Sequence, residues 1–284
     1  MFKTITLKPT KEKSILRRHP WVFSGAIKAI ENGISNGDIV EIKSNKGRFL
    51  GYGHYNEGSI AIRIFELNQL TIDNAYWEGK IKKAISQRHH NLEINGKNNI
   101  YRLVHAEGDE MPGCIIDRYD NIIVMQFHSV GMWKLKEIFS KNIAKQLPEI
   151  DVIYDKSENT LPEVLKQEFQ IQNSYLLRKI DVSDVIASEY GNEFKINWVT
   201  GQKTGFFIDQ RENRKLLGEY SQNKVILNTF CYSGGFSIYA LNKGAKEVYS
   251  LDSSKKAMKI VEENVKLLPQ DLQQKHHSIT DDAM

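Results

Sequence analysis

Two adjacent glycines, and an acid that follows the next apolar stretch, are the residues of this 284-residue sequence that point most directly to chemistry. Residues 224–237 read Lys-Val-Ile-Leu-Asn-Thr-Phe-Cys-Tyr-Ser-Gly-Gly-Phe-Ser, an apolar strand followed by a loop that contains Gly234 and Gly235. Glycines lack a Cβ, so a ligand can approach their backbone. Asp252 ends a second strand. It follows Asn228 by about the spacing at which an acid binds a ribose in nucleotide-binding βαβ units. This pattern predicts a nucleoside site.

The type of nucleoside follows from what the loop lacks. A dinucleotide requires G-x-G-x-x-G to bind its pyrophosphate at a helix N-terminus, so a dehydrogenase is disfavoured. S-adenosylmethionine carries adenosine and a sulfonium but no phosphate, and a glycine turn beside Phe230 and Tyr232 suits it, with help from cation–π contacts. A third strand is expected to end near Asp281 and Asp282, where a carboxylate could reach the adenine amino group. The alternative is a glycine turn that only joins strand to helix.

A second segment, residues 200–214, reads Thr-Gly-Gln-Lys-Thr-Gly-Phe-Phe-Ile-Asp-Gln-Arg-Glu-Asn-Arg. It predicts a helix from Asp209 to Tyr220, with Asp209 as the N-cap and with Gln210 and Arg211 in the first turn. The start of this helix is expected to face the same cleft as the glycine loop, and Lys203 lies on the loop before it. The alternative is a capped surface helix preceded by a basic loop.

The N-terminal region suggests contact with nucleic acid. Residues 1–28 contain seven Lys or Arg and one acid, an excess that attracts phosphate backbones. Arg17, Arg18 and His19 stand beside Trp21 and Phe23, and cations next to aromatic rings suit RNA through phosphate contacts and base stacking. One alternative is a solvated lysine-rich surface. A second places Trp21 and Phe23 in the core of a small barrel with only the arginines exposed, which leaves the role of the arginines unchanged.

Composition excludes several classes. Hydrophobic residues make up 40% of the chain and its net charge is +4, as expected of a globular protein with buried cores. The two cysteines, Cys114 and Cys231, form no CxxC pair, so neither a zinc site nor a disulfide framework is expected, and free thiols fit a reducing cytosol. The sequence contains no signal-peptide pattern and no apolar run of about 18 residues. It is predicted to be cytoplasmic, with no membrane partner.

The elements that must position these residues can be outlined from hydrophobic periodicity. Residues 1–67 alternate as short strands of a small barrel. Residues 70–93 have helical spacing after Asp73, a predicted N-cap. From Val225 onward, strands and helices alternate, which predicts a parallel α/β sheet. Further elements are expected at 38–43, 49–55 and 60–65 (strands), at 114–127 and 186–200 (hairpins), and at 133–147 (a helix before Pro148).

Four stretches together resemble one family, the bacterial large-subunit ribosomal RNA 5-methylcytosine methyltransferases with an N-terminal PUA domain. They are Arg-Arg-His-Pro-Trp-Val-Phe-Ser-Gly-Ala-Ile, Gly-Asp-Glu-Met-Pro-Gly-Cys-Ile-Ile-Asp-Arg-Tyr, Lys-Thr-Gly-Phe-Phe-Ile-Asp-Gln-Arg-Glu-Asn-Arg and Asn-Thr-Phe-Cys-Tyr-Ser-Gly-Gly-Phe-Ser, in family order. The resemblance implies a multidomain α/β protein. Residues 1–68 would form a PUA-like β-barrel, 69–180 a mixed α/β middle domain, and 181–284 an incomplete Rossmann-like class I methyltransferase domain.

The resemblance also implies a site and a reaction. The cofactor S-adenosylmethionine would be lined by Asp209, Gln210, Arg211, the Phe230–Gly235 loop, Asp252 and an acid near Asp282. The substrate would be ribosomal RNA, bound with the help of Arg17, Arg18, His19 and Lys203. In the family a cysteine attacks C6 of cytosine and makes C5 nucleophilic towards the methyl group. A homodimer is implied as well, although nothing in the sequence itself points to one.

The sequence departs from the family pattern near its end. The Asp-Pro-Pro motif and the later catalytic cysteine segment are absent, and neither Cys114 nor Cys231 takes the nucleophile's place, so no catalytic residue is assigned. We expect a C-terminally truncated chain with an exposed sheet edge and little or no activity alone. The open alternatives are an RNA-binding protein without catalysis, and a methyltransferase acting on another RNA or on a protein.

Overall fold

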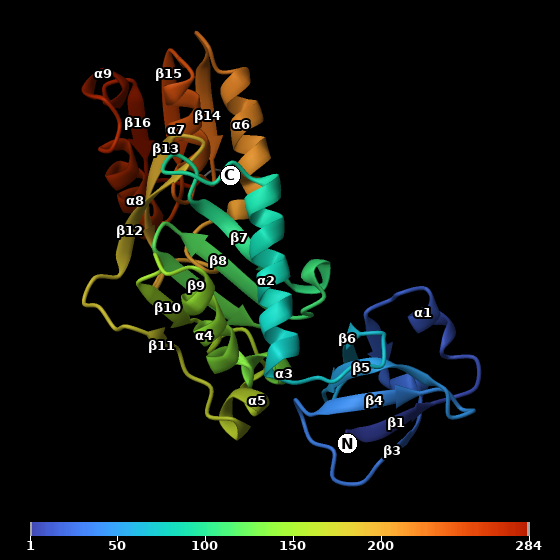
Figure 1. The fold of residues 1–284 in the computed structure, drawn as a ribbon. Coiled ribbons are helices and arrows are strands. Elements are labelled where there is room, and N and C mark those ends of the chain that lie inside the picture. The colour runs from blue at the N-terminus through green and yellow to red at the C-terminus, as the bar shows by residue number, and fades with distance from the viewer. Residues whose placement is uncertain (1, 283–284) are drawn as a thin grey trace. The chain divides into compact units, whose positions relative to one another are not determined.

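The computed structural model describes residues 2–282, which belong to two compact units. Unit 1 comprises Met1–Leu92, Arg102–Asp117 and Asn121–Lys179, and unit 2 comprises Glu93–Tyr101, Arg118–Asp120 and Ile180–Met284. Figure 1 labels the helices and strands. Within residues 2–282, none of the helices combines the length and apolar content that crossing a bilayer requires.

The first part of unit 1 is a six-stranded sheet in the order β2-β6-β5-β4-β1-β3. The alternation predicted for residues 38–43 is confirmed, because Val40 and Ile42 of β4 are fully buried. With Ile5, Leu7 and Ile62 they belong to the hydrophobic core of this sheet. Its elements are β1 Lys3–Leu7, α1 Lys13–Leu16, β2 Trp21–Phe23, η1 Ser24–Ala26, β3 Ile27–Ile30, β4 Ile39–Lys43, β5 Phe49–Tyr55 and β6 Ile60–Glu66.

Unit 1 also holds most of a five-stranded sheet in the order β11-β10-β9-β8-β7. The hairpin expected at 114–127 is present, and Asp120 turns it with a φ of 54°. The elements are α2 Asn74–Asn91, β7 Ile100–His105, η2 Ala106–Asp109, β8 Cys114–Tyr119, β9 Ile122–Phe127, α3 Val130–Trp133, α4 Lys136–Gln146, β10 Val152–Asp155, α5 Glu163–Glu168 and β11 Ser174–Leu177.

Two helix predictions in unit 1 have different outcomes. Asp73 caps α2 as predicted, since its side chain accepts a hydrogen bond from the Tyr76 amide at 3.0 Å. The helix expected over 133–147 is present as α4, which ends at Gln146 as expected but begins three residues later, at Lys136, because α3 ends at Trp133. The short α3 before it has its own cap, which periodicity does not show: Ser129 accepts a hydrogen bond from the Met132 amide.

Unit 2 contains the βαβ pattern predicted from Val225 onward. Its strands β14, β15 and β16 are parallel and adjacent in that order, so the ends of β14 and β15 lie side by side. The β12–β13 hairpin precedes them. The elements are β12 Asp184–Glu189, β13 Asn192–Asn197, η3 Ile208–Gln210, α6 Arg211–Glu219, β14 Val225–Thr229, α7 Gly235–Asn242, β15 Glu247–Leu251, α8 Lys255–Val265, α9 Gln270–Gln273 and β16 His276–Ile279.

A chain of buried and part-buried hydrogen bonds fixes α7 to the three parallel strands. Asn228 Nδ2 donates to Ser237 Oγ at 2.9 Å, and the Ser237 and Ser250 hydroxyls lie 2.7 Å apart. His276 Nε2 lies 2.8 Å from Ser250 Oγ, and burial lowers the pKa of His276 to about 4, so that its ring is neutral at pH 7. The loop after β14 is therefore joined to a rigid base.

The expected exposed sheet edge is found at β14, which has no second strand neighbour within residues 2–282. Val225 and Leu227 on this strand are 60% and 61% exposed, although strands of parallel sheets usually have both faces covered. Nearby in sequence, Tyr220 is 73% exposed. An uncharged, apolar strand edge of this kind promotes association between chains.

We therefore predict that this chain self-associates through β14 and that Val225→Lys with Leu227→Lys reduces the association, because lysines on an edge strand oppose pairing. Sedimentation velocity over a concentration series measures the effect. Val164→Lys on α5 is the matched control, since Val164 is 75% exposed but lies outside any strand. A wild-type chain that stays monomeric at high concentration would contradict the prediction.

Candidate functional site

A cavity of about 520 Å³ lies in unit 2 where the loop after β14 meets three other segments. The predicted glycine loop contributes Phe230, Tyr232 and Gly235, and the acid predicted to bind ribose, Asp252, lies in the same cavity. Gln210, at the start of α6, also lines it. The remaining walls come from residues 200–207 and from the first two turns of α8.

The loop between β14 and α7 has an alternating backbone. Phe230, Tyr232 and Gly234 have φ values of 55°, 47° and 73°, all in the left-handed region. Residues other than glycine adopt this region at a cost on the order of 1–3 kcal/mol each, and such strain gathers at binding sites. At Gly234 a Cβ would also lie 3.2 Å from the Val261 side chain, so this glycine is required by both its conformation and its surroundings.

Asp252 organises that loop. One carboxylate oxygen accepts a hydrogen bond from the Tyr232 amide at 3.0 Å, and the other accepts one from the Ser254 amide at 2.9 Å. An ionised carboxylate has about four acceptor positions. Asp252 thus fixes the glycine loop and still has acceptor capacity for two further hydroxyl groups.

Tyr232 joins the glycine loop to residues 200–207. Its hydroxyl accepts a hydrogen bond from the Gln202 amide at 2.9 Å, and its ring meets that of Phe207 edge-on at 5.1 Å. Burial raises the pKa of Tyr232, so the phenol remains protonated at neutral pH. At the other end of the segment, the buried Thr204 hydroxyl lies 2.7 Å from the Tyr119 hydroxyl. Both walls of the cavity are thus held by hydrogen bonds.

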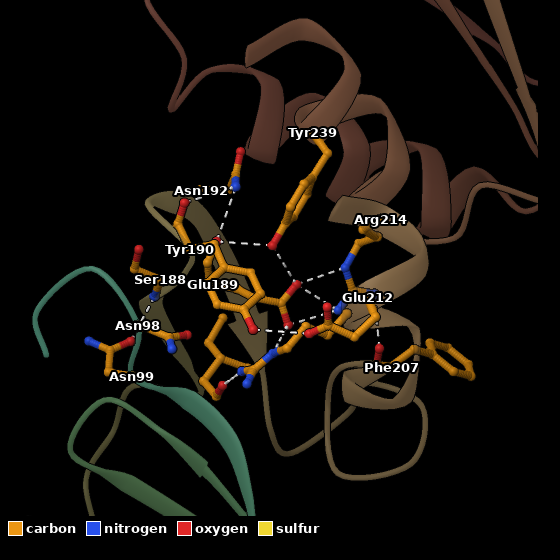
Figure 2. Close-up of polar contacts among 12 residues, drawn as sticks. Asn98, Asn99, Ser188, Glu189, Tyr190, Asn192, Phe207, Glu212, Arg214 and Tyr239 are labelled. Carbon is orange, nitrogen blue, oxygen red and sulfur yellow. Dashed lines mark hydrogen bonds and ion pairs between the residues drawn. The ribbon is translucent and has the colours of Figure 1, made fainter. Parts of the chain in front are cut away.

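A buried ion cluster around Glu189 (Figure 2) adjoins the cavity through Arg214. Arg214 donates to both carboxylate oxygens of Glu189, with Nε 2.8 Å from Oε1 and Nη2 2.9 Å from Oε2. Arg211 donates from Nε at 3.2 Å and also reaches the carbonyl of Ile100. The Tyr239 hydroxyl donates to the same carboxylate at 3.0 Å. The cluster therefore fastens β12, α6 and α7 to one another.

Neither cysteine is activated as a nucleophile. Burial, together with the nearby negative charge of Asp252, raises the pKa of Cys231 to about 12. Burial also raises the pKa of Cys114, which is fully inaccessible. Since the thiolate is the reactive form, neither side chain is suited to attack at neutral pH.

The predicted cofactor residues divide into two groups. Gln210, Phe230, Tyr232, Gly235 and Asp252 line the cavity. Within the described residues 2–282, the lining of the cavity does not include the other predicted residues, Asp209, Arg211, Gly234 and Asp282. For this second group, contact with a cofactor stays a prediction that the cavity does not support.

Two residues of the second group, Asp209 and Arg211, have contacts outside the cavity. Asp209 was expected to cap α6, and this is wrong: it lies within η3, 3.7 Å from Lys203 Nζ, and the N-cap is Gln210, without a side-chain hydrogen bond. Arg211 points to Glu189, and only 7% of it is exposed. Asp282 does follow β16, as the expected position of the third strand required.

The predicted RNA-binding residues lie on the surface of their units. Arg17, Arg18 and His19 are exposed, and Phe23 beside them is 50% exposed rather than part of the core. Trp21 is half-buried, and its Nε1 donates to Glu107 at 2.9 Å. In unit 2, Lys203 is exposed and lies over the Phe207 ring at 4.4 Å. Contact of these residues with RNA stays a prediction.

The sequence interpretation missed three residues, Glu189, Arg214 and Tyr239. Arg214 lines the cavity although only 2% of it is exposed. Its spacing of three from Arg211 places both arginines on one face of a helix, which was a usable signal. Glu189 lies in a hairpin 25 residues before Arg214, and no local spacing rule links the two.

Comparison with known proteins agrees with this architecture. Residues 5–67 match the family model of a PUA-like domain, and residues 176–279 match that of an S-adenosylmethionine-dependent methyltransferase. The ribosomal RNA large subunit methyltransferase I of Pseudoalteromonas atlantica is 38% identical over 267 residues, which are 93% of this chain and 66% of that protein. The protein of the same name from Vibrio vulnificus is 33% identical over 276 residues, or 97% of this chain and 68% of that one.

Solved structures show the same fold. A Streptococcus mutans protein described as an S-adenosylmethionine-dependent methyltransferase has a TM-score of 0.81 at 19% identity and covers 99% of this chain and 71% of its own. A protein described as a methyltransferase, in complex with S-adenosylhomocysteine, has a TM-score of 0.83 at 19% identity, with 100% and 70% covered. At such low identity these two likenesses show the fold alone.

The two family models and the fold define the class as S-adenosylmethionine-dependent methyltransferases with a PUA-like domain. Within that class, this chain belongs to the family of ribosomal RNA large subunit methyltransferase I. It spans about two thirds of the length of these relatives. The predicted family and fold class are thereby confirmed, whereas the domain boundaries at 68 and 180 stay predictions.

We predict that Glu189→Gln destabilises unit 2 by about 3–5 kcal/mol, because it leaves two buried guanidinium groups without their counter-charge. Urea unfolding monitored by far-UV circular dichroism measures the loss. Glu193→Gln on β13, where the side chain is exposed, is the matched control and should change the free energy of unfolding by less than about 0.5 kcal/mol. Equal effects of the two substitutions would contradict the assigned role.

We also predict that Cys231 resists alkylation. With a pKa of about 12, it holds far less thiolate at pH 8 than an ordinary cysteine, so iodoacetamide should react at least about a hundredfold more slowly than with the unfolded chain. The rate should keep rising above pH 9 as the thiol ionises. Peptide mass spectrometry of a Cys114→Ser variant isolates the signal. Fast labelling that levels off near pH 8 would be incompatible with the raised pKa.

Proposed function

We propose that this chain binds S-adenosylmethionine in the cavity of unit 2 and takes part in the methylation of cytosine C5 in large-subunit ribosomal RNA. The observation that carries the proposal is that the glycine loop and the Asp252 carboxylate line one cavity, with spare acceptor capacity on that carboxylate. Membership of the methyltransferase family supports the cofactor. When bound, the cofactor supplies a methyl group on a cationic sulfur.

The residues of the cavity fit the chemical groups of this cofactor. Ribose hydroxyls can donate to the free acceptor positions of Asp252. The adenine ring can pack against aromatic side chains, and Phe230, 68% exposed, is free of the core to do so. The walls provide no glycine pattern for a pyrophosphate, which favours a nucleoside without phosphate over a dinucleotide.

The RNA part of the proposal is supported by the exposed cations of unit 1. Arg17, Arg18 and His19 offer phosphate contacts, and the exposed Phe23 ring lies 6.2 Å from that of His19. The relatives are named for the large subunit of ribosomal RNA, which makes that RNA the first substrate to test. Another RNA is the alternative outcome.

Neither cysteine of this chain is suited to be the attacking thiol of the family's reaction. Cys114 and Cys231 are buried with raised pKa values, and Cys231 lies 3.6 Å from the Met258 sulfur, packed as a small hydrophobic group. We therefore assign to this chain cofactor binding and RNA binding, and we expect little methyl transfer by it in isolation.

Cofactor binding is tested by calorimetry. The wild-type chain should bind S-adenosylmethionine, and Asp252→Ala should weaken binding at least about tenfold, since it removes charged hydrogen-bond acceptors from the ribose. Asp271→Asn, an exposed acid on α9, is the matched control and should bind as the wild type does. Thermal melts establish that all variants are folded. A wild-type chain without measurable binding refutes the proposal.

RNA specificity is tested with methyl-labelled cofactor and two deproteinised substrates, large-subunit ribosomal RNA and transfer RNA. Because neither cysteine is activated, label transfer should be slight, and nucleoside analysis should assign whatever is transferred to 5-methylcytidine in the ribosomal RNA. Filter binding should show weaker retention of that RNA by Arg17→Gln with Arg18→Gln. Label in another nucleoside, or in transfer RNA alone, excludes the proposed specificity.

A further inference from the structure

The buried cluster that adjoins the cavity has unequal charges. Glu189 is fully buried, while Arg211 and Arg214 are 7% and 2% exposed, so two guanidinium cations share one carboxylate. Glu212, an acid of the same helix, is exposed and accepts its hydrogen bond from the Tyr190 hydroxyl at 2.9 Å. One positive charge is therefore left without a buried counter-charge, an arrangement that favours an anion nearby.

Only one of these two arginines borders the cavity. Arg214 is among its lining residues and Arg211 is not. Gly235 allows this approach, because a Cβ on that residue would lie 3.0 Å from Arg214 Cδ. The Arg214 side chain therefore lies against the beginning of α7, on the side where the glycine loop enters the helix.

Arg214 also has hydrogen-bonding capacity to spare. Its Nε and Nη2 donate to Glu189, and its Nη1 donates to the Phe207 carbonyl at 2.9 Å (Figure 2). A guanidinium group has five N–H donors, so these bonds leave one N–H on each terminal nitrogen. Glu189 and Phe207 hold the group in one orientation, and a held guanidinium needs little reorganisation to bind an anion.

We propose that Arg214 binds the carboxylate of the amino-acid part of S-adenosylmethionine. This inference rests on the proposed function and goes further by assigning one end of the ligand. Adenine and ribose carry no charge, and the ammonium and sulfonium groups are cations that a positively charged cluster repels. The carboxylate is the one anionic group of the ligand, and guanidinium–carboxylate hydrogen bonds are among the strongest in proteins.

The assignment also gives the ligand a direction. Asp252 is an anion whose free acceptor positions suit the ribose hydroxyls, whereas Arg214 is a cation that suits the carboxylate. Both line the same cavity, with Gly235 next to Arg214 and Tyr232 bonded to Asp252. A ligand with a neutral nucleoside end and a carboxylate end is therefore bound in one orientation.

The decisive comparison uses two ligands that differ only in the carboxylate, S-adenosylmethionine and decarboxylated S-adenosylmethionine. Calorimetry should give a preference for the complete cofactor of about 10- to 100-fold in the wild type, the range expected for a charged hydrogen-bonded pair. Arg214→Gln should reduce the preference to about onefold, and Arg214→Lys should retain part of it because the charge remains. A purely structural role would weaken both ligands alike and leave their ratio unchanged.

Arg211→Gln is the matched control, because it removes a buried guanidinium from the same Glu189 without changing the cavity lining. It should lower the melting temperature and yet keep most of the preference for the complete cofactor. An equal loss of preference in this variant would attribute the effect to the cluster's charge in general and would overturn the assignment to Arg214.

The wild-type measurement distinguishes failure of the Arg214 assignment from failure of the proposed function, even if a variant does not fold. Equal affinity of the wild type for both ligands overturns the role of Arg214 while leaving cofactor binding intact. Failure of the wild type to bind either ligand overturns the proposed function and, with it, this inference. Tight binding of the complete cofactor and weak binding of its decarboxylated form supports both.

Discussion

The arrangement of unit 2 depends on one buried carboxylate. Glu189, on the β12–β13 hairpin, accepts hydrogen bonds from Arg211 and Arg214 of α6 and from Tyr239 of α7. Without it, two guanidinium groups would be buried with no anion, a state that costs several kcal/mol. The same carboxylate therefore holds together the β12–β13 hairpin, α6 and α7.

The cavity takes its shape from this constraint together with a second one. Asp252 binds the amides of Tyr232 and Ser254, so the loop after β14 is fixed by the strand beside it. The strained conformations of Phe230 and Tyr232 are stable because those bonds, and the Tyr232–Gln202 bond, compensate for them. Glu189 thus fixes the helices beside the cavity, and Asp252 fixes the glycine loop. The proposed ligand contacts use the hydrogen-bonding positions that remain free on Arg214 and on Asp252.

Sequence patterns predicted the elements correctly where the residues that determine an element lie close together in the chain. The bounds of β5 agree with the expected range of 49–55, and Asp73 caps α2. The predicted helix starts were displaced where two local signals competed. A 3-10 turn at Ile208–Gln210 displaced Asp209 from the cap position. The helix expected from residue 133 begins at Lys136, after the separate turn that Ser129 caps. Helix starts depend on which polar side chain reaches the free amides, and periodicity does not decide that.

The sequence by itself determined the family, the glycine loop, and the acid one strand further on, because a βαβ unit brings the ends of its parallel strands together whatever surrounds them. Only the tertiary structure decided which charged residues face the cavity. Arg211 and Arg214 are three positions apart on one helix. A glutamate from a separate hairpin pairs with both of them, and only Arg214 borders the cavity. Pairing between charges depends on their distance in space, and that distance is set by packing between elements that no local pattern encodes.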